Sequence, residues 1–217
     1  MLRNNRKDVI YAAESKVSKG RNSKRRRRDH ARKGIDSLTA RELASKLGVS
    51  TRPIFTYFDT MDELKNEVYT FAKNLYRDYI EQGLKAPVPN LGVGQQYLRF
   101  AKAEPELYKL LYLNNTVGES GGAMEALKMS QELVRGSIME KYKMDADTAD
   151  KYFRDLWLVA YSFTTLIVTG ECPYTDEEIS NIFIEFSLSI VKAYKEIPGL
   201  TEGKFDKDRI FNELVNK

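Results

Sequence analysis

Apolar residues recur every third or fourth position along most of the 217-residue chain, which is the pattern of amphipathic helices. Apolar and polar residues almost never alternate over four or more positions, so the pattern gives little indication of strands. Glycines, prolines and capping residues divide the chain into expected helices at about 6–19, 39–47, 51–58, 61–82, 95–103, 105–113, 123–142, 146–169, 176–197 and 206–215. The predicted fold class is all-α.

The long helix predicted at 61–82 has one apolar side. We expect its buried stripe to comprise Leu64, Val68, Phe71, Leu75, Tyr79 and Ile80. Residues 83–94 then hold three glycines and two prolines, and they are predicted to form a break and a linker. The acids at the start of the 176–197 helix suit the helix dipole and do not indicate catalysis.

The short helices at 39–58 have the physical pattern of a helix-turn-helix. Thr39 and Glu42 form a predicted capping box, and Ser50 is expected to cap the second helix. The residues expected to bury the pair, or to shape its turn, are Leu43, Ala44, Leu47, Gly48, Val49, Ile54, Phe55 and Phe58. This leaves an outer side of the second helix, where donors and a planar cation meet base edges and phosphates, made of Thr51, Arg52, Thr56 and Tyr57.

Charge is distributed unevenly along the chain. Residues 1–60 carry 16 Lys and Arg against 6 Asp and Glu, a net charge of +10. Residues 61–217 carry 19 against 25, a net charge of −6. A basic head on an acidic body indicates that the head alone has a polyanionic partner.

Several classes of protein are not expected. One cysteine, Cys172, excludes an intrachain disulfide, and with the one histidine, His30, it cannot form a dedicated zinc site. No metal, cofactor or membrane partner is predicted, because no apolar run reaches 18 residues and no P-loop or dinucleotide motif occurs. The first residues lack the apolar core of a secretory signal, so we expect a cytoplasmic protein. The same missing motifs, and a single histidine for a catalytic triad, lead us to expect that the protein is not an enzyme.

The head of the chain resembles the TetR/AcrR family of bacterial regulators. The resemblance lies in Ile10-Tyr11-Ala12-Ala13, in Gly34-Ile35-Asp36, in the Arg-Glu-Leu-Ala and Leu-Gly-Val-Ser stretches of 41–50, and in Tyr57-Phe58. It implies a three-helix DNA-binding domain at 1–60, with a basic insertion at about 21–32, and a helical dimerisation and effector domain at 61–217. The DNA contacts that it implies are Thr39, Ser50, Thr51, Arg52, Pro53, Thr56 and Tyr57. Met61 replaces the lysine that the family often has before its fourth helix, and Lys65 is a substitute for that phosphate contact.

The C-terminal part resembles the family only in general terms. A dimer interface is expected on the last two long helices, at Phe163, Ile167, Phe183, Phe186 and Ile190. An effector cavity is expected among the aromatics Tyr97, Phe100, Tyr108, Tyr112, Trp157 and Tyr161, whose apolar rings and polar tips suit a mixed ligand. The alternatives are that these aromatics are plain core and that the last long helix is central to one monomer.

The resemblance and the charge pattern together predict a homodimeric, sequence-specific transcriptional regulator. We expect it to bind a palindromic double-stranded operator and to act as a repressor that a small molecule releases. The alternative is a basic-tailed helical adaptor that binds RNA or anionic surfaces without sequence preference. Recovery of a palindrome from random duplex DNA would favour the regulator.

The basic insertion generates a prediction of its own. Residues 21–28 carry six cations and no acid. We expect Arg25, Arg26, Arg27 and Arg28 to grip phosphates, because each contact releases counterions and contributes about −0.9 to the log–log salt slope of DNA binding. Replacing these four arginines with Gln should make the slope shallower by about two to four units while the preferred operator stays nearly unchanged. An identical slope in binding titrations over a salt series would show that the insertion does not meet DNA.

Overall fold

The computed structural model describes residues 9–10, 12–13, 39–47, 50–113 and 122–216 of the chain. Within them, Val9, Ile10, Ala12 and Ala13 are helical, and no strand occurs. The remaining elements are α2 (Ala40–Leu47), α3 (Arg52–Tyr57), α4 (Met61–Leu84), α5 (Pro89–Ala103), α6 (Pro105–Tyr112), α7 (Ala123–Tyr142), α8 (Ala146–Thr169), α9 (Asp176–Glu196) and α10 (Lys207–Val215). The all-α prediction is confirmed.

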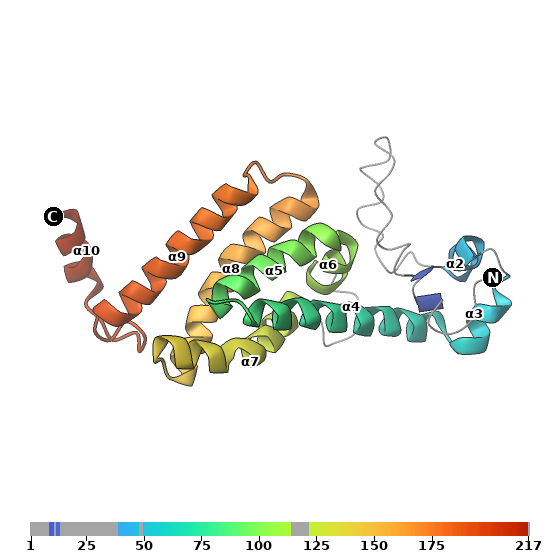
Figure 1. Cartoon of the computed structure of the whole chain (residues 1–217), viewed down its shortest axis with the longest axis horizontal. Helices are drawn as coiled ribbons and strands as arrows, with labels where there is room; N and C mark the ends of the chain where they lie inside the picture. Colours follow the sequence, from blue (N-terminus) through green and yellow to red (C-terminus); the bar gives the residue numbers. More distant parts are fainter. Residues whose placement is uncertain (1–8, 11, 14–38, 48–49, 114–121, 217) are drawn as a thin grey trace.

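The molecule is elongated along α4, whose N-terminal end carries the small helices α2 and α3 (Figure 1). The rest of α4 packs mainly against α5 and also against α6 and α7, and α8 packs on α5 and α7 to complete one helical body. Helix α9 packs antiparallel on α8, and α10 stands clear of the body beyond the end of α9 (Figure 1). The two short N-terminal helices therefore lie at the far end of the molecule from α10.

The predicted break at 83–94 is present but shorter than expected, because only residues 85–88 are non-helical. Helix α4 continues to Leu84 and α5 begins at Pro89, which occupies the first turn of its helix, where a missing N–H costs nothing. The glycines serve a crossing: a Cβ on Gly83 would lie 2.6 Å from the Cα of Val93, and one on Gly92 would overlap the carbonyl oxygen of Gly83. The glycines of this segment therefore permit close backbone contact between α4 and α5.

The buried stripe of α4 also differs from the expected one. Its buried residues follow each other every fourth position, as Leu64, Val68, Ala72, Tyr76 and Ile80. Phe71, Leu75 and Tyr79 are half-buried and pack at the edges of the core. The small Ala72 and the polar-tipped Tyr76 are less apolar than their neighbours, but the four-residue spacing places both in the buried stripe.

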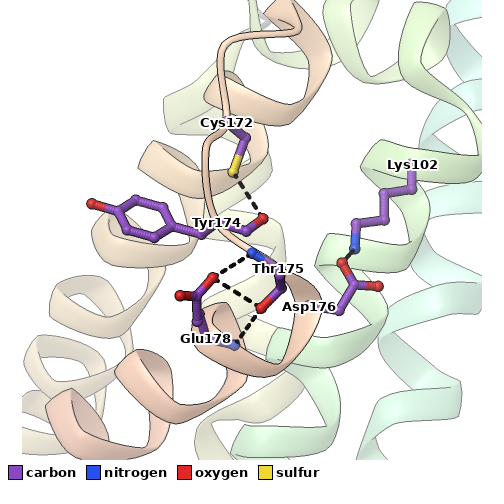
Figure 2. Close-up of polar contacts among 6 residues, drawn as sticks. All are labelled: Lys102, Cys172, Tyr174, Thr175, Asp176 and Glu178. Carbon is purple, nitrogen blue, oxygen red and sulfur yellow. Dashed lines mark hydrogen bonds and ion pairs between the residues drawn. The ribbon is translucent and has the colours of Figure 1, made fainter.

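A capping box starts α9, as Figure 2 shows. The hydroxyl of Thr175 accepts a hydrogen bond from the Glu178 amide, and the Glu178 carboxylate accepts one from the Thr175 amide at 2.7 Å. The bond from the Thr175 amide, and a second one from the Thr175 hydroxyl at 2.9 Å, lower the pKa of the Glu178 carboxyl. Lys102 of α5 forms an ion pair with Asp176 and so fixes the start of α9 against α5 (Figure 2). The interpretation of these acids as helix-start residues is confirmed.

A buried polar network joins four helices at the other end of the body. The Asn90 amide of α5 donates to the Tyr152 hydroxyl of α8 at 2.9 Å and accepts from the Tyr142 hydroxyl of α7 at 2.9 Å. Tyr152 and Ser187 of α9 form a further hydrogen bond of 2.7 Å. Because each buried polar group costs free energy when unpaired, the network specifies one arrangement of these helices.

The glycine crossing predicts opposite effects of one substitution at two sites. Gly92→Ala places a methyl group into the backbone of α4 and should lower the free energy of unfolding by about 1–3 kcal/mol. Gly136→Ala in α7 meets nothing within 4 Å in the described part of the chain and should raise it by about 0.5–1 kcal/mol. Urea unfolding followed by circular dichroism measures both, and equal midpoints for the two variants would contradict the crossing.

Candidate nucleic-acid interface

The two short helices are held together by a small apolar core. Leu43 and Ala44 of α2 and Ile54 of α3 are buried, and Phe58, just after α3, is buried with them. Val9, Ala12 and Ala13 belong to the same core cluster, as do Leu64 and Val68 from the first turns of α4. Because Leu64 and Val68 share this cluster, the position of α3 is coupled to α4. Gly48, Val49 and the side chains of Glu42 and Leu47 lie outside the described residues, so the predicted capping box and turn stay predictions.

The exposed side of α3 differs from the expected one at Phe55. Its ring is 48% exposed, whereas burial was predicted. Arg52, Phe55 and Thr56 stand three and four positions apart, so they share the outer face, opposite to Ile54 and Phe58. The hydrophobicity of Phe55 favours burial, so the sequence predicts it in the core. Its spacing of three positions from Arg52 is the signal that places it on the exposed face.

The other residues of the predicted reading surface are less uniform. Ser50 and Thr39 are exposed, and Thr51 is half-buried. Tyr57, which was expected on the outer side, is half-buried and packs against the core. The Thr56 hydroxyl donates to the Arg52 carbonyl at 3.1 Å, and the Pro53 side chain lies outside the described residues. The resulting face offers one guanidinium, one aromatic ring and hydroxyl groups.

The cap of α3 is Thr51 and not Ser50, so that prediction is wrong. Thr51 has helical backbone angles, and no side-chain hydrogen bond closes the helix start. The Thr51 carbonyl accepts from the Ile54 amide at 3.1 Å, as in a tight first turn. Ser50 is therefore one residue too far upstream to cap, and its hydroxyl remains at the surface.

The start of α4 has an ordered N-terminus. Thr60 accepts a hydrogen bond from the Glu63 amide at 3.1 Å, and the Glu63 carboxylate accepts one from the Asp59 amide at 2.7 Å. Lys65, predicted to contact a phosphate, has a 20% exposed side chain whose amine lies 3.6 Å from Asp62. Its DNA contact stays a prediction. The basic run that includes Arg25–Arg28 lies outside the described residues.

The six aromatics that were predicted to line an effector cavity do come together. Tyr97, Phe100, Tyr108, Tyr112 and Trp157 are buried, and Tyr161 is half-buried. Tyr108 stacks on Tyr112 with ring centres 4.5 Å apart, and Trp157 stacks on Tyr161 at 5.1 Å. Tyr76 of α4, which the sequence reasoning missed, meets Tyr112 edge-on at 5.6 Å. We call these seven residues the aromatic cluster; its members come from α4, α5, α6 and α8.

Polar groups within the aromatic cluster are neutral. Burial raises the pKa of Tyr76 to about 12, and it also raises the pKa values of Tyr97, Tyr108 and Tyr112. Tyr108 forms a hydrogen bond of 2.6 Å with Thr164. The Trp157 indole N–H is buried and has no hydrogen-bond partner within the described residues. The Tyr112 hydroxyl is likewise buried without a partner among the described residues, so the cluster combines flat apolar surfaces with hydroxyl groups and two unpaired polar groups.

The predicted dimer-interface residues differ in their exposure within the protomer. Phe163 and Phe183 are buried, with the Phe183 ring packed directly over the backbone of Gly94 in α5. Ile167 and Ile190 are half-buried, and Phe186 is 48% exposed. Other exposed apolar side chains on α8 and α9 are Leu158, Ile184 and Leu188. A large apolar area of these two helices is thus uncovered in a single protomer.

Two further findings concern the described residues as a set. None of their helices has the length and apolar character needed to cross a membrane. They also contain no group of three or more His, Cys, Asp or Glu side chains that could hold a metal ion.

A helix-turn-helix with an exposed second helix, carried on an all-helical body, defines a class of DNA-binding proteins. The model of the family described as bacterial regulatory proteins, tetR family, matches residues 27–68, which include α2, α3 and the start of α4. The chain also shares its fold with a tetR-family transcriptional regulator from Streptomyces coelicolor, with a TM-score of 0.64, 17% identity and coverage of 97% of this chain and 93% of that chain. A comparison with curated proteins gives no match.

Residues 27–68 carry the DNA-binding region of the TetR family of bacterial regulatory proteins. This match falls on the helix-turn-helix, and the shared fold extends over the helical body. The resemblance deduced from the sequence is confirmed, and it indicates DNA-binding regulation of transcription.

Base recognition by Arg52 generates the next prediction. Arg52→Ala should cost about 1–3 kcal/mol of binding free energy on the specific site and relax the preference at one position per half-site. Arg52→Lys keeps the charge but loses the bidentate fork, so it should relax that same position while retaining affinity for nonspecific DNA. Arg77→Ala, an exposed arginine in the middle of α4, is the charge-matched control. Site selection from random duplex DNA measures all three, and an unchanged profile for Arg52→Ala would remove Arg52 from base reading.

Proposed function

We propose that this protein is a homodimeric repressor of transcription that leaves a palindromic operator when a small molecule binds. The observation that carries the proposal is the exposed face of α3 on a helix-turn-helix whose core is continuous with α4. Residues 1–60 form the DNA-binding domain in this proposal, and residues 61–217 form the dimerisation and effector domain. The site of action is the cytoplasm, where the DNA of a bacterium is accessible.

The DNA-binding residues in the proposal are those that the family resemblance implied, together with Phe55, Lys65 and the four arginines of the basic insertion. Arg52 and Thr56 read base edges, joined by Phe55, whose ring is suited to contact a thymine methyl group. The remaining contacts fix the protein on the phosphates, and they comprise Thr39, Ser50, Thr51, Pro53, Tyr57, Lys65 and Arg25–Arg28. Phosphate contacts supply affinity, whereas the short α3 surface supplies the discrimination.

Dimerisation through α8 and α9 is supported by their uncovered apolar side chains. Phe186 is 48% exposed and borders the buried side of α9, on which Phe183 and Ser187 lie. Exposed large apolar patches on a protein of this size mark interaction sites. Two copies that cover these patches would form a four-helix interface and would hold two α3 helices at the fixed spacing that a palindrome requires.

Effector sensing is supported by the composition and position of the aromatic cluster. Its flat rings suit a planar ligand, and the unpaired Trp157 N–H suits a ligand that accepts a hydrogen bond. Tyr76 lies in the cluster on the same stripe of α4 that holds Leu64 and Val68 in the DNA-binding core. A ligand that separates the rings would shift α4, and the preferred state would then present the two α3 helices at the wrong spacing.

The alternative adaptor predicts binding that has no sequence preference and no role for α3. A selection from random duplex DNA separates the two: a recovered palindrome supports the repressor, and an unselective pool supports the adaptor. The exposed Arg52, Phe55 and Thr56 face favours the repressor, because nonspecific binding needs only cations and no shaped reading surface.

The dimer interface generates a prediction. Phe186→Asp places an unpaired charge at the centre of the proposed interface, at a cost of several kcal/mol, and should convert the dimer into a folded monomer. Affinity for the selected operator should fall with it, while binding to nonspecific DNA persists. Asn181→Asp adds the same charge at an exposed position on another side of α9 and is the control. Light scattering gives the mass, and a Phe186→Asp variant that stays dimeric would place the interface elsewhere.

A further inference from the structure

Helix α10 is an amphipathic helix that packs extensively on no other helix in the described part of the chain. Asp206 caps it by accepting from the Arg209 amide at 3.0 Å, and none of its residues is buried. Its apolar side chains stand at spacings of one and four, so they share one face: Ile210, Phe211, Leu214 and Val215. The exposed fractions of Phe211, Leu214 and Val215 are 60%, 65% and 82%. A short helix of this kind gains little stability from its backbone alone and requires a surface to pack on.

The connection before α10 directs it away from its own helical body. Lys151 of α8 donates to the Thr201 carbonyl at 2.5 Å, and Lys204 donates its amide to the Gly199 carbonyl at 2.8 Å. This turn at residues 197–204 is thereby attached to α8 near the end of α9. Figure 1 shows α10 leaving that point into open space, on the side of α9 that faces away from α8. The helix is anchored at its base and uncovered along its length.

A groove of matching character lies at the opposite end of α9. Its volume is about 490 Å³, and it runs between α5 and the first half of α9. Its lining is mainly apolar, with cations at the α5 side, and comprises Leu91, Gln95, Leu98, Arg99, Lys102, Ala103, Asp176, Ile179, Ser180, Phe183 and Ile184. Lys102 is paired with Asp176, and Arg99 is an exposed cation at the rim.

Helix α9 is apolar on two opposite flanks. Phe186 is two residues from both Ile184 and Leu188, which at about 100° per residue puts it on the other side of the helix from them. Ile184 lines the groove, and Leu188 follows it one turn later on the same flank. An interface centred on Phe186 therefore leaves the groove flank uncovered, and this second apolar surface needs its own occupant.

We infer that α10 of one protomer docks into the α5–α9 groove of a second copy of this chain. The inference rests on the proposed dimer: a two-fold axis across the middle of α9 pairs the helices antiparallel and brings the end of one beside the start of the other. The base of α10 then lies beside the partner's groove. The groove of its own protomer is about 31 Å away, because the two ends of the 21-residue α9 are that far apart.

Charge and length fit this arrangement. The nine residues of α10 are about 14 Å long, enough for two and a half turns along the groove. Glu213 borders the apolar face of α10, and its weak pair with Arg209, at 3.9 Å, leaves it available to Arg99 at the groove rim. The two α10 helices thus bind on both sides of the proposed interface formed by α8 and α9.

Disulfide trapping between differently tagged chains tests the inference. One full-length chain carries Leu214→Cys and the other Ser180→Cys, both in a Cys172→Ser background, and the two are co-expressed and oxidised. A disulfide-linked product that contains both tags is expected. Asn212→Cys, on the polar side of α10, is the matched control and should give at least about tenfold less product. Absence of the Leu214–Ser180 product while the dimer persists in light scattering would overturn the docking and leave the proposed dimer intact.

Four further variants distinguish the source of any failure. A single chain with both cysteines that forms an internal disulfide and migrates as one chain would show that α10 folds onto its own groove, which also overturns the inference. Glu213→Arg and Arg99→Glu should each raise the dissociation constant of the dimer several-fold, and the combined variant should restore it. If Phe186→Asp loses the dimer while both charge variants keep the dissociation constant of the dimer unchanged, the proposed interface is upheld and the docking of α10 is rejected.

Discussion

The stripe of buried residues at every fourth position of α4 connects the two halves of this protein. Leu64 and Val68 complete the core of the helix-turn-helix, and Tyr76 and Ile80 enter the core of the body. A helix of 24 residues is stiff over this length, so a displacement at one end is carried to the other. Helix α4 therefore connects the DNA-binding face to the aromatic cluster as one continuous helix without a hinge.

Close packing around α4 fixes what that helix can do. Gly83 and Gly92 let α4 and α5 touch through their backbones, where no side chain is free to rearrange. The aromatic cluster is packed edge-on and face-on, and burial raises the pKa values of Tyr76 and Tyr112, so their hydroxyls stay protonated. Such a core has few intermediate arrangements, so a change in it favours a shift between discrete states.

Helix α9 illustrates how one element serves several surfaces. Ile179 and Phe183 bury it in the protomer, Ser187 joins it to the polar network, and its two flanks remain apolar and uncovered. Its start is fixed by the capping box and by Lys102. Crowding of apolar residues on a single helix is therefore the result of separate demands from the core, from the proposed dimer and from the groove.

The sequence by itself determined the helical class, the bounds of most helices and the helix-turn-helix, because these depend on local spacing, capping and turn residues. It also singled out the aromatics of the cluster, since six large rings at helical spacing have to be buried together. Local pattern misjudged residues 83–94, where glycines permit a crossing and do not end a helix. It likewise misplaced Phe55, whose hydrophobicity suggests burial although its helical position is outward.

Only the tertiary structure decided which apolar residues find partners within the protomer. Phe183 and Phe186 are three positions apart on the same helix, yet one packs on Gly94 and the other is half exposed. The same holds for α10, whose pattern predicts an amphipathic helix but not the absence of a surface beneath it. Periodicity records which side of a helix is apolar, whereas the element that covers this side is set by contacts between residues far apart in the chain.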